Sequence, residues 1–241
     1  MTVTASPVPI LNDNYAWLLR ESSTGATAIV DPADAQPIIE ALEKAGGRLD
    51  MILLTHHHAD HIAGVDEVRA RFNCPVVGAV ADMHRLPRLD QAVKEGDTVR
   101  LGNATAEVIE TPGHTRGQIN FFFADGGILL SGDTLFSLGC GRLNEGTPAE
   151  MFASLRKLAA LPADTLVCCG HEYTENNARF ALAVDPDNKV LHEFVGRVEQ
   201  LRAAGEPSVP SVLADELKVN PFLLAPDAAS FAMLRAKKDK F

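Results

Sequence analysis

The sequence predicts an α/β fold followed by a smaller helical region. Up to about residue 172, short β-rich runs alternate with helical patterns, and glycine, aspartate and proline residues separate them. From Thr174 onward the β-rich runs stop, and apolar residues recur at helical spacing. With 241 residues, 46% of them hydrophobic, the chain can bury one large core and a small appendage. We therefore expect one domain over residues 1–172 and a helical subdomain over residues 173–241.

The individual elements follow from apolar periodicity and from the residues that interrupt it. Strands are expected at residues 15–19, 27–30, 51–54, 75–80, 106–109, 118–123, 127–130 and 165–169. Helices are expected at residues 34–46, 65–72, 147–161, 174–184, 188–204, 211–218 and 227–238. The clearest helix start is at Thr147, where Pro148 and Glu150 complete the pattern of a capping box.

Composition excludes several classes of partner. The chain has 32 acidic and 22 basic residues, and its net charge of −10 disfavours nonspecific binding to nucleic acids or anionic membranes. It has neither a basic N-terminal region followed by an apolar stretch nor an apolar run long enough to span a membrane. The four cysteines show no CxxC spacing, which is typical of free thiols in a reducing compartment. We therefore expect a cytoplasmic protein with no nucleic-acid or membrane partner.

A histidine-rich run follows the buried strand predicted at residues 51–54. His56, His58, Asp60 and His61 lie where the chain leaves the sheet, and open α/β layers place their sites at such an edge. Imidazole nitrogen and carboxylate oxygen suit zinc, iron and manganese. The spacing is too tight for one tetrahedral ion to use all four side chains. Residues 56 and 58 can face one position, while residues 60 and 61 turn toward a neighbouring one.

Three further segments place a metal-compatible side chain directly after a β-rich run. They end in Gly113-His114, Gly132-Asp133 and Gly170-His171. Glycine before each candidate donor allows a tight turn that aims the following side chain. Together with the histidine-rich run, these segments offer five histidines and two aspartates, enough for two metal ions with open positions for water.

The other three histidines are not expected to bind metal. His57 should point away from its neighbours by alternation, His84 belongs to a surface turn, and His192 lies on a helix.

These residues resemble the signature of the metallo-β-lactamase superfamily, T-H-x-H-x-D-H with downstream histidine, aspartate and histidine. Within it, the chain is similar almost from end to end to the hydroxyacylglutathione hydrolases, also called glyoxalase II. The supporting stretches are residues 12–15, 132–136, 139–142, 145–147, 170–174, 220–222 and 235–241.

The resemblance implies an α+β fold of the αββα sandwich type, with a smaller C-terminal helical subdomain that supplies part of the substrate site. It also implies two divalent metal ions per chain, with zinc expected and iron or manganese also compatible. By the resemblance, His56, His58 and His114 hold one ion, and Asp60, His61 and His171 hold the other, while Asp133 bridges them. Asp60 and Asp133 are accordingly the residues with expected catalytic roles.

The resemblance further implies hydrolysis of S-(2-hydroxyacyl)glutathione, as in the second step of methylglyoxal detoxification, where S-D-lactoylglutathione gives D-lactate and glutathione. Two ions can lower the pKa of a shared water toward neutrality and stabilise the oxyanion. Arg142, Tyr173, Arg235 and Lys238 match the family's glutathione-contacting positions, and cations suit the carboxylates of glutathione. Asn144 departs from the family, which commonly has an aromatic residue there. The expected partner is this small thioester, and a monomer is expected.

Other functions remain compatible with the sequence. Another hydrolase of the superfamily would act on a lactone, a β-lactam or a different thioester. A persulfide dioxygenase would use one iron held by two histidines and an aspartate, which the intact set of Asp60, His61 and His171 disfavours. RNA processing usually requires an added domain, and a metal-binding scaffold without catalysis is the remaining alternative.

Overall fold

The computed structural model describes residues 2–241 and contains two six-stranded β-sheets. The first sheet has the strand order β1 (Val3–Ile10), β2 (Asn14–Glu21), β3 (Thr27–Val30), β4 (Met51–Leu53), β5 (Val76–Ala79), β6 (Gln91–Val93). The second has the order β14 (Ser211–Val212), β13 (Leu166–Cys169), β10 (Ile128–Gly132), β9 (Ile119–Phe123), β8 (Ala104–Glu110), β7 (Thr98–Leu101). A separate hairpin pairs β11 (Leu135–Phe136) with β12 (Gly139–Cys140).

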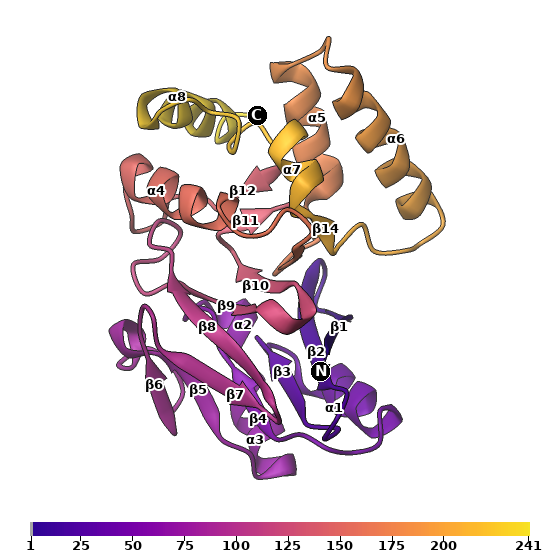
Figure 1. The fold of residues 1–241 in the computed structure, drawn as a ribbon, viewed down its shortest axis with the longest axis vertical. Helices are drawn as coiled ribbons and strands as arrows, with labels where there is room; N and C mark the ends of the chain where they lie inside the picture. Colours follow the sequence, from indigo (N-terminus) through magenta and orange to yellow (C-terminus); the bar gives the residue numbers. More distant parts are fainter. Residues whose placement is uncertain (1) are drawn as a thin grey trace.

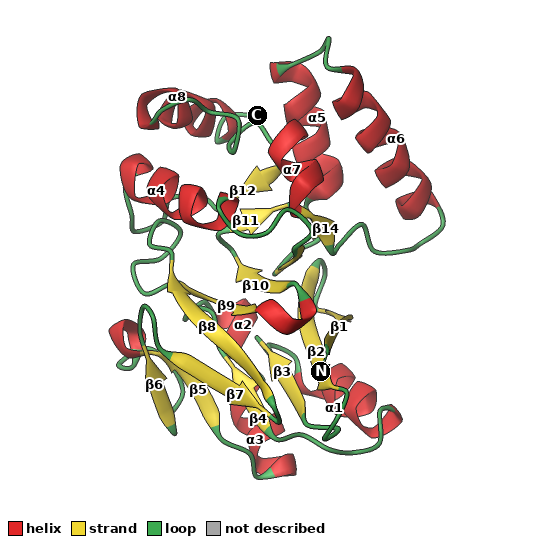
Figure 2. Cartoon of the chain, in the orientation of Figure 1, coloured by secondary structure: helices red, strands yellow, loops and turns green. Residues whose placement is uncertain are grey.

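Helices cover the outer faces of the two sheets. They are α1 (Ala35–Lys44), α2 (Ala59–Ile62), α3 (Val65–Phe72), α4 (Pro148–Ala159), α5 (Thr174–Val184), α6 (Lys189–Ala203), α7 (Leu213–Val219) and α8 (Ala228–Lys238), with short 3₁₀ turns η1 (Val80–Asp82) and η2 (Ala124–Gly126). Figure 1 shows α1 and α3 at one end of the molecule and α4 to α8 at the other, and Figure 2 shows the strands between these two groups of helices. This arrangement is an αββα sandwich, so the predicted fold class is confirmed.

Three apolar layers hold the sandwich together. One layer lies between the helices α1 and α3 and the first sheet and includes Ile38 and Leu42. A second lies between the two sheets and includes Trp17 and Phe121, and a third joins the second sheet to α4 and α8. Because both faces of each sheet are covered, strands such as β3 are buried at every position.

One side-chain hydrogen bond also crosses the interior between the sheets. Nε1 of Trp17 on β2 donates to the carbonyl oxygen of Cys169 at the end of β13, at 2.8 Å. The indole therefore satisfies a buried backbone acceptor on the opposite sheet while its ring fills the apolar layer.

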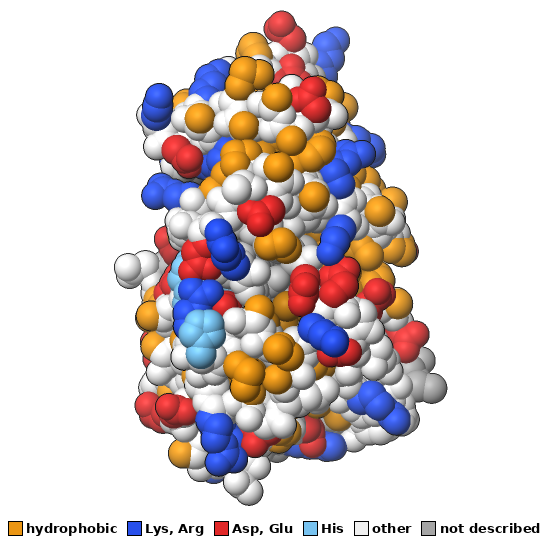
Figure 3. All heavy atoms as spheres, turned by 90° about the vertical axis from the view of Figure 1, so that its left-hand side faces the viewer, with side chains coloured by type: hydrophobic (Ala, Val, Ile, Leu, Met, Phe, Trp, Pro, Cys, Tyr) orange, Lys and Arg blue, Asp and Glu red, His pale blue; other side chains and the backbone are white. Residues whose placement is uncertain are grey.

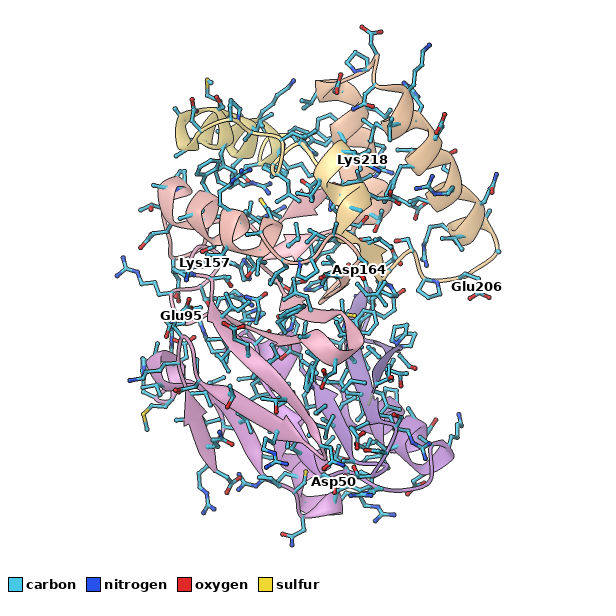
Figure 4. All side chains as sticks on the ribbon, viewed as in Figure 1. Asp50, Glu95, Lys157, Asp164, Glu206 and Lys218 are labelled. Atoms are coloured by element: carbon cyan, nitrogen blue, oxygen red, sulfur yellow. The ribbon has the colours of Figure 1, made fainter. Side chains whose placement is uncertain are left out.

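Helix α4 begins as the sequence predicts. The hydroxyl of Thr147 accepts from the backbone N–H of Glu150, and the Glu150 carboxylate accepts from the backbone N–H of Thr147, which forms the expected capping box. Lys157 pairs with Glu95 at 3.0 Å, and Figure 4 shows these two side chains together beside the second sheet.

The C-terminal region differs from prediction at its strand. The expectation that β-rich segments stop after residue 172 is wrong, because Ser211 and Val212 form β14 and pair antiparallel with β13. The helix expected from residue 211 therefore begins at Leu213 instead. This strand packs the C-terminal region against the second sheet, and the division at residues 172 and 173 stays a prediction.

Strand β1 was also missed, because Pro7 and Pro9 interrupt its apolar pattern. Both prolines lie on an edge strand, where the missing backbone N–H costs no ladder hydrogen bond on the open side. Along residues 2–241, no helix has both the length and the apolar character needed to cross a membrane. Acidic and basic side chains are interspersed on the face shown in Figure 3.

Candidate metal centre

The first group of candidate metal donors consists of His56, His58 and His114, and we call it donor set 1. Its candidate ligand atoms all lie within 4.8 Å of one another. His56 and His58 follow β4 of the first sheet, whereas His114 follows β8 of the second, so both sheets contribute. Nδ1 of His58 lies 3.0 Å from Nε2 of His114.

The second group consists of Asp60, His61 and His171, and we call it donor set 2. Its candidate ligand atoms also lie within 4.8 Å of one another. Asp60 and His61 are on the short helix α2, and His171 comes directly after Gly170 at the end of β13. The Nε2 atoms of His61 and His171 are 3.3 Å apart, and Oδ2 of Asp60 is 3.5 Å from Nε2 of His171.

Asp133 lies between the two donor sets. Its Oδ2 is 3.4 Å from Nε2 of His114 and 3.4 Å from Nε2 of His171, and its Oδ1 is 3.3 Å from Nε2 of His61. The preceding Gly132 has a φ of 47°, and a Cβ there would lie 2.4 Å from the Thr55 hydroxyl. Only glycine therefore lets the chain turn here and place Asp133 against both sets.

The seven side chains fit two divalent cations. Nε2 of His56 and Oδ1 of Asp133 are buried and have no hydrogen-bond partner among the described residues. Buried polar atoms are nearly always satisfied, so such orphaned atoms need an explanation, and a bound ion provides one. Nitrogen and carboxylate donors suit zinc, iron and manganese. Each donor set thus offers ligands for one ion, and the Asp133 carboxylate lies close to both sets.

At His56 and Asp133, electrostatics favour the protonation state that binds metal, whereas at His61 and His171 the neighbouring carboxylates outweigh burial and raise the pKa. Burial, together with the neighbouring His61, holds the pKa of His56 well below its usual value, so His56 is neutral. Burial alone would raise the pKa of Asp133, but His61 and His171 outweigh it and hold that pKa well below its usual value. Neutral imidazole and ionised carboxylate are the forms that coordinate a cation.

Asp31, which no sequence motif identifies, contacts His61 on the side away from the other donors. It is buried at the end of β3, and it lies close enough to His56 and His61 to form a third possible donor group. However, its carboxylate accepts from the backbone N–H and the hydroxyl of Thr55, at 2.8 and 2.6 Å, and lies 3.0 Å from Nδ1 of His61. Asp31 therefore orients His61 and leaves Nε2 of that ring for an ion. The sequence signal that could have identified Asp31 is the position of an aspartate directly after a fully buried strand.

Asp13, in the turn between β1 and β2, and Asn14, the first residue of β2, also reach donor set 2. These residues lie in a stretch that supports the family resemblance, but the sequence gives no spacing that would assign them a role.

A cavity of about 700 Å³ opens beside the donors. Its lining includes His114 and Asp133, the aromatic residues Phe136 and Tyr173, and four cations, Arg142, Arg179, Arg235 and Lys238. The structure thus brings all four predicted substrate residues to one cavity. Arg179 was missed, although it follows Glu175 and Asn176 at helical spacing on α5 and shares their face toward the cavity.

The predicted substrate residues differ in how freely their charges face the cavity. Arg235 is buried; it donates to the carbonyl oxygen of Cys140 at 3.0 Å and pairs with Asp239 at 2.8 Å. Lys238 donates to the carbonyl oxygen of Asn176 at 3.1 Å.

Tyr173 and Asn144 differ in their position relative to the cavity. Tyr173 is 38% exposed, and its ring stacks on that of His171, with centroids 4.5 Å apart. Asn144 is exposed and, within residues 2–241, is not part of the cavity lining.

The three histidines left without a role lie elsewhere. Nδ1 of His57 is 3.0 Å from the buried carboxylate of Asp82. His84 is exposed in a turn, and Nε2 of His192 lies 2.7 Å from the carbonyl oxygen of Pro186.

Two family models match the chain and together cover most of it. The model described as "Metallo-beta-lactamase superfamily" matches residues 11–171, and the one described as "Hydroxyacylglutathione hydrolase C-terminus" matches residues 172–241.

Similar proteins extend the match to nearly the whole chain. A hydroxyacylglutathione hydrolase of Acidiphilium cryptum is 57% identical over 99% of this chain and 97% of its own length. One of Cereibacter sphaeroides is 51% identical over 97% of both chains.

Solved structures share the fold. ETHE1 from Myxococcus xanthus has a TM-score of 0.73 at 24% identity and aligns with 98% of this chain and 90% of its own. TTHA1623, solved in a di-iron-bound form, has a TM-score of 0.60 at 30% identity over 69% of this chain and 91% of its own.

Proposed function

The chain belongs to the hydroxyacylglutathione hydrolases of the metallo-beta-lactamase superfamily, and from this membership we propose that it hydrolyses S-(2-hydroxyacyl)glutathione thioesters. The products are a 2-hydroxy acid and glutathione.

One structural observation carries the proposal. Asp133 lies within 3.4 Å of members of both donor sets, and it also lines the cavity that contains the four cations. A site that can activate water therefore adjoins a site that can hold an anionic thiol carrier, which is the combination that a glutathione thioester requires.

The donor sets would each hold one divalent ion, and two such ions would supply an activated water and polarise the thioester carbonyl. The residues of the chain perform the other tasks. Arg142 and Lys238 bind the carboxylates of the glutathione moiety and hold the thioester against the centre. Tyr173 stacks on His171 and lines the cavity next to donor set 2. The thiolate released is a moderate leaving group, because a thiol has a pKa of about 8.5.

No cysteine acts as a nucleophile in this proposal. All four cysteines are free and buried. Burial raises the pKa of Cys140, the cysteine that lines the cavity, to about 11, so its thiol stays protonated. Attack by water alone, without an acyl-enzyme, is consistent with this environment.

The finer assignments are part of the same proposal. We infer that the ions are zinc, with iron or manganese as alternatives, because all three accept nitrogen and carboxylate donors. The substrate is S-D-lactoylglutathione and the product D-lactate, which corresponds to the second step of methylglyoxal detoxification. A monomeric state, a cytoplasmic location and the lack of nucleic-acid or membrane partners stay predictions.

The alternatives are less well supported. A lactonase, a β-lactamase or a persulfide dioxygenase would share the fold, but residues 172–241 match the C-terminal model of the hydroxyacylglutathione hydrolases. A dioxygenase iron held by two histidines and one aspartate would use three donors, whereas donor set 1, donor set 2 and Asp133 together offer seven.

The proposal is tested by assaying the purified protein, with its metal content measured, on S-D-lactoylglutathione, a lactone and a β-lactam. We expect thioester hydrolysis to dominate. Asp133→Ala should lose at least one ion and reduce hydrolysis by more than about 100-fold, because even outer partners of metal ligands cost roughly 10–100-fold in affinity or activity.

The matched control is Asp125→Ala, which removes an exposed carboxylate at η2 away from the donors. It should keep both ions and full activity. Preferential hydrolysis of the lactone or the β-lactam would refute the thioester assignment, and an Asp133→Ala variant with two ions and full activity would refute the role of Asp133.

A further inference from the structure

We infer that Asp13, on the turn between β1 and β2, is a positioning residue that sets the affinity of donor set 2 for its metal ion. The inference rests on the proposed metal binding but not on the identity of the substrate. It assigns to the N-terminal hairpin a selective influence on one of the two ions.

The backbone fixes this turn against the end of β13. The N–H of Glu172 donates to the carbonyl oxygen of Asp13, and the N–H of Tyr15 donates to that of Gly170, both at 2.8 Å. Asn14 and His171 also form an isolated antiparallel bridge. The turn therefore brackets His171 on both sides, and its side chains have a fixed position relative to that ring.

The carboxylate of Asp13 orients the imidazole of His171. Oδ1 of Asp13 lies 3.0 Å from Nδ1 of His171. Because an ionised carboxylate can only accept, Nδ1 carries the proton and donates it, which leaves the lone pair on Nε2. That Nε2 faces Asp60, His61 and Asp133 at 3.3 to 3.5 Å. A carboxylate behind a histidine ligand also makes the imidazole more basic and the metal bond stronger.

Asn14 contacts a second member of donor set 2, Asp60. Its Nδ2 donates to the carbonyl oxygen of Asp60 at 2.9 Å and to the carboxylate of Asp60 at 3.2 Å. Asp13 and Asn14 thus contact two of the three residues of donor set 2.

Donor set 1 is supported from other parts of the chain. Nδ1 of His56 lies 3.0 Å from the hydroxyl of Thr55, and Nδ1 of His114 lies 2.9 Å from the carbonyl oxygen of Arg142. Both supports are neutral and neither comes from the β1–β2 turn. Removing the Asp13 carboxylate should therefore weaken one ion and leave the other unchanged.

Asp13 is suited to a direct test because its side chain is 46% exposed and fills no part of the core. The variants are Asp13→Ala, which removes the acceptor, and Asp13→Asn, which keeps an acceptor oxygen without the charge. The control is Asn12→Ala, an exposed change in the same turn. The readout is Zn²⁺ binding to the metal-free proteins, measured by titration against a competing chelator, together with metal content after dialysis.

We expect Asp13→Ala to bind one Zn²⁺ as the unaltered protein does and the second with a dissociation constant raised about 10–100-fold. For Asp13→Asn, the dissociation constant of the second Zn²⁺ should lie between those of the unaltered protein and Asp13→Ala. Asn12→Ala should match the unaltered protein. Two ions held by Asp13→Ala at unchanged affinity would overturn the inference. Equal weakening of both ions, or the same loss in Asn12→Ala, would also overturn it, because either would indicate a general disturbance. The titration involves no thioester, so a protein that behaves as expected here but fails to hydrolyse glutathione thioesters would refute only the proposed substrate.

Discussion

At the scale of single residues, the cavity concentrates positive charge at Lys238. Its ammonium group is partly buried and lies over the rings of Phe180 and Phe241, at 5.3 and 5.5 Å from the ring centroids. Burial first, and then the charges of Arg235, Arg179 and Arg142, lower the pKa of Lys238 to about 8. The group is therefore charged at neutral pH but loses its charge in mildly alkaline solution, where an arginine would not.

This sensitivity gives a prediction for the pH dependence of substrate binding. A lysine binds a carboxylate only below its pKa, so kcat/KM for a glutathione thioester should fall as the pH rises through about 8. Lys238→Arg should remove this fall, because guanidinium stays charged. Lys238→Ala should raise KM at pH 7 by about tenfold, since a charge-assisted hydrogen bond contributes roughly 1.5 kcal/mol or more and about 1.4 kcal/mol corresponds to a factor of ten.

The measurement is kcat/KM from pH 6 to about pH 9.5 for each variant, with the exposed Lys237→Ala as the control. Identical pH profiles for the unaltered protein and Lys238→Arg would contradict the role given to Lys238.

The candidate metal donors could be predicted from the sequence, but the residues that orient their side chains could not. Each donor outside the histidine-rich run follows a β-rich run and a glycine, as in Gly132-Asp133, and this local pattern is visible without a structure. Asp13 and Asp31 act on rings that are distant along the chain, His171 and His61, so no spacing connects them. Their role depends on which strands become neighbours in the fold, and short-range sequence patterns do not reveal this pairing.

At the scale of elements, the β11–β12 hairpin connects the cavity to the C-terminal helices. Leu138 in its turn has a positive φ of 56°, which is unfavourable for leucine. Its N–H donates to the buried carboxylate of Glu216 on α7 at 2.8 Å. Asn220, directly after α7, donates to the carbonyl oxygens of Phe136 and Gly139, both at 3.1 Å. The end of α7 therefore holds a hairpin whose residues line the cavity.

Asn220→Ala should loosen this hairpin without removing a metal donor. Two buried carbonyl oxygens would lose their donor, so the free energy of unfolding should fall by about 1–3 kcal/mol. KM for the glutathione thioester should rise, because Phe136 and Cys140 shape the cavity, while both ions stay bound. Denaturant unfolding, steady-state kinetics and metal analysis measure the three quantities.

Lys218→Ala is the control for this element, since Lys218 is exposed on α7, where Figure 4 labels it. If Asn220→Ala loses stability but keeps its KM, the hairpin is held in other ways and its assigned role in shaping the cavity is wrong.

Helices were easier to predict than short strands. The helix Thr174–Val184 was predicted with its observed bounds, because apolar residues recur over three turns. The strands β11, β12 and β14 have two residues each, which is too short for a period of two to be recognised. They form because neighbouring strands or turns offer them hydrogen-bond partners, as β13 does for β14.

At the scale of the whole molecule, the candidate centre depends on the two sheets keeping their relative position. Donor set 1 takes His56 and His58 from the first sheet and His114 from the second, and donor set 2 combines α2 with the end of β13. The apolar layer between the sheets and the hydrogen bond from Trp17 to Cys169 hold this arrangement. Periodicity in the sequence predicts strands, but it does not predict that they form two facing sheets, which came only from the family resemblance.

Trp17→Phe should destabilise the whole sandwich rather than one sheet. The carbonyl oxygen of Cys169 would lose its donor, so the free energy of unfolding should fall by about 1–3 kcal/mol. Circular dichroism in denaturant measures the loss, because Trp17 is the only tryptophan and its fluorescence disappears with it. An unchanged free energy of unfolding would show that the indole N–H contributes nothing to holding the sheets together.

The position of Asp133 has a thermodynamic consequence for how the protein takes up its ions. A carboxylate in contact with both sites cannot be polarised by one ion without altering what it offers to the other. Linkage requires this influence to be mutual: the factor by which the first ion changes the affinity for the second equals the factor for the reverse order. The half-loaded forms are therefore coupled species, and their abundance depends on the affinity of each donor set as well as on the coupling through this shared side chain.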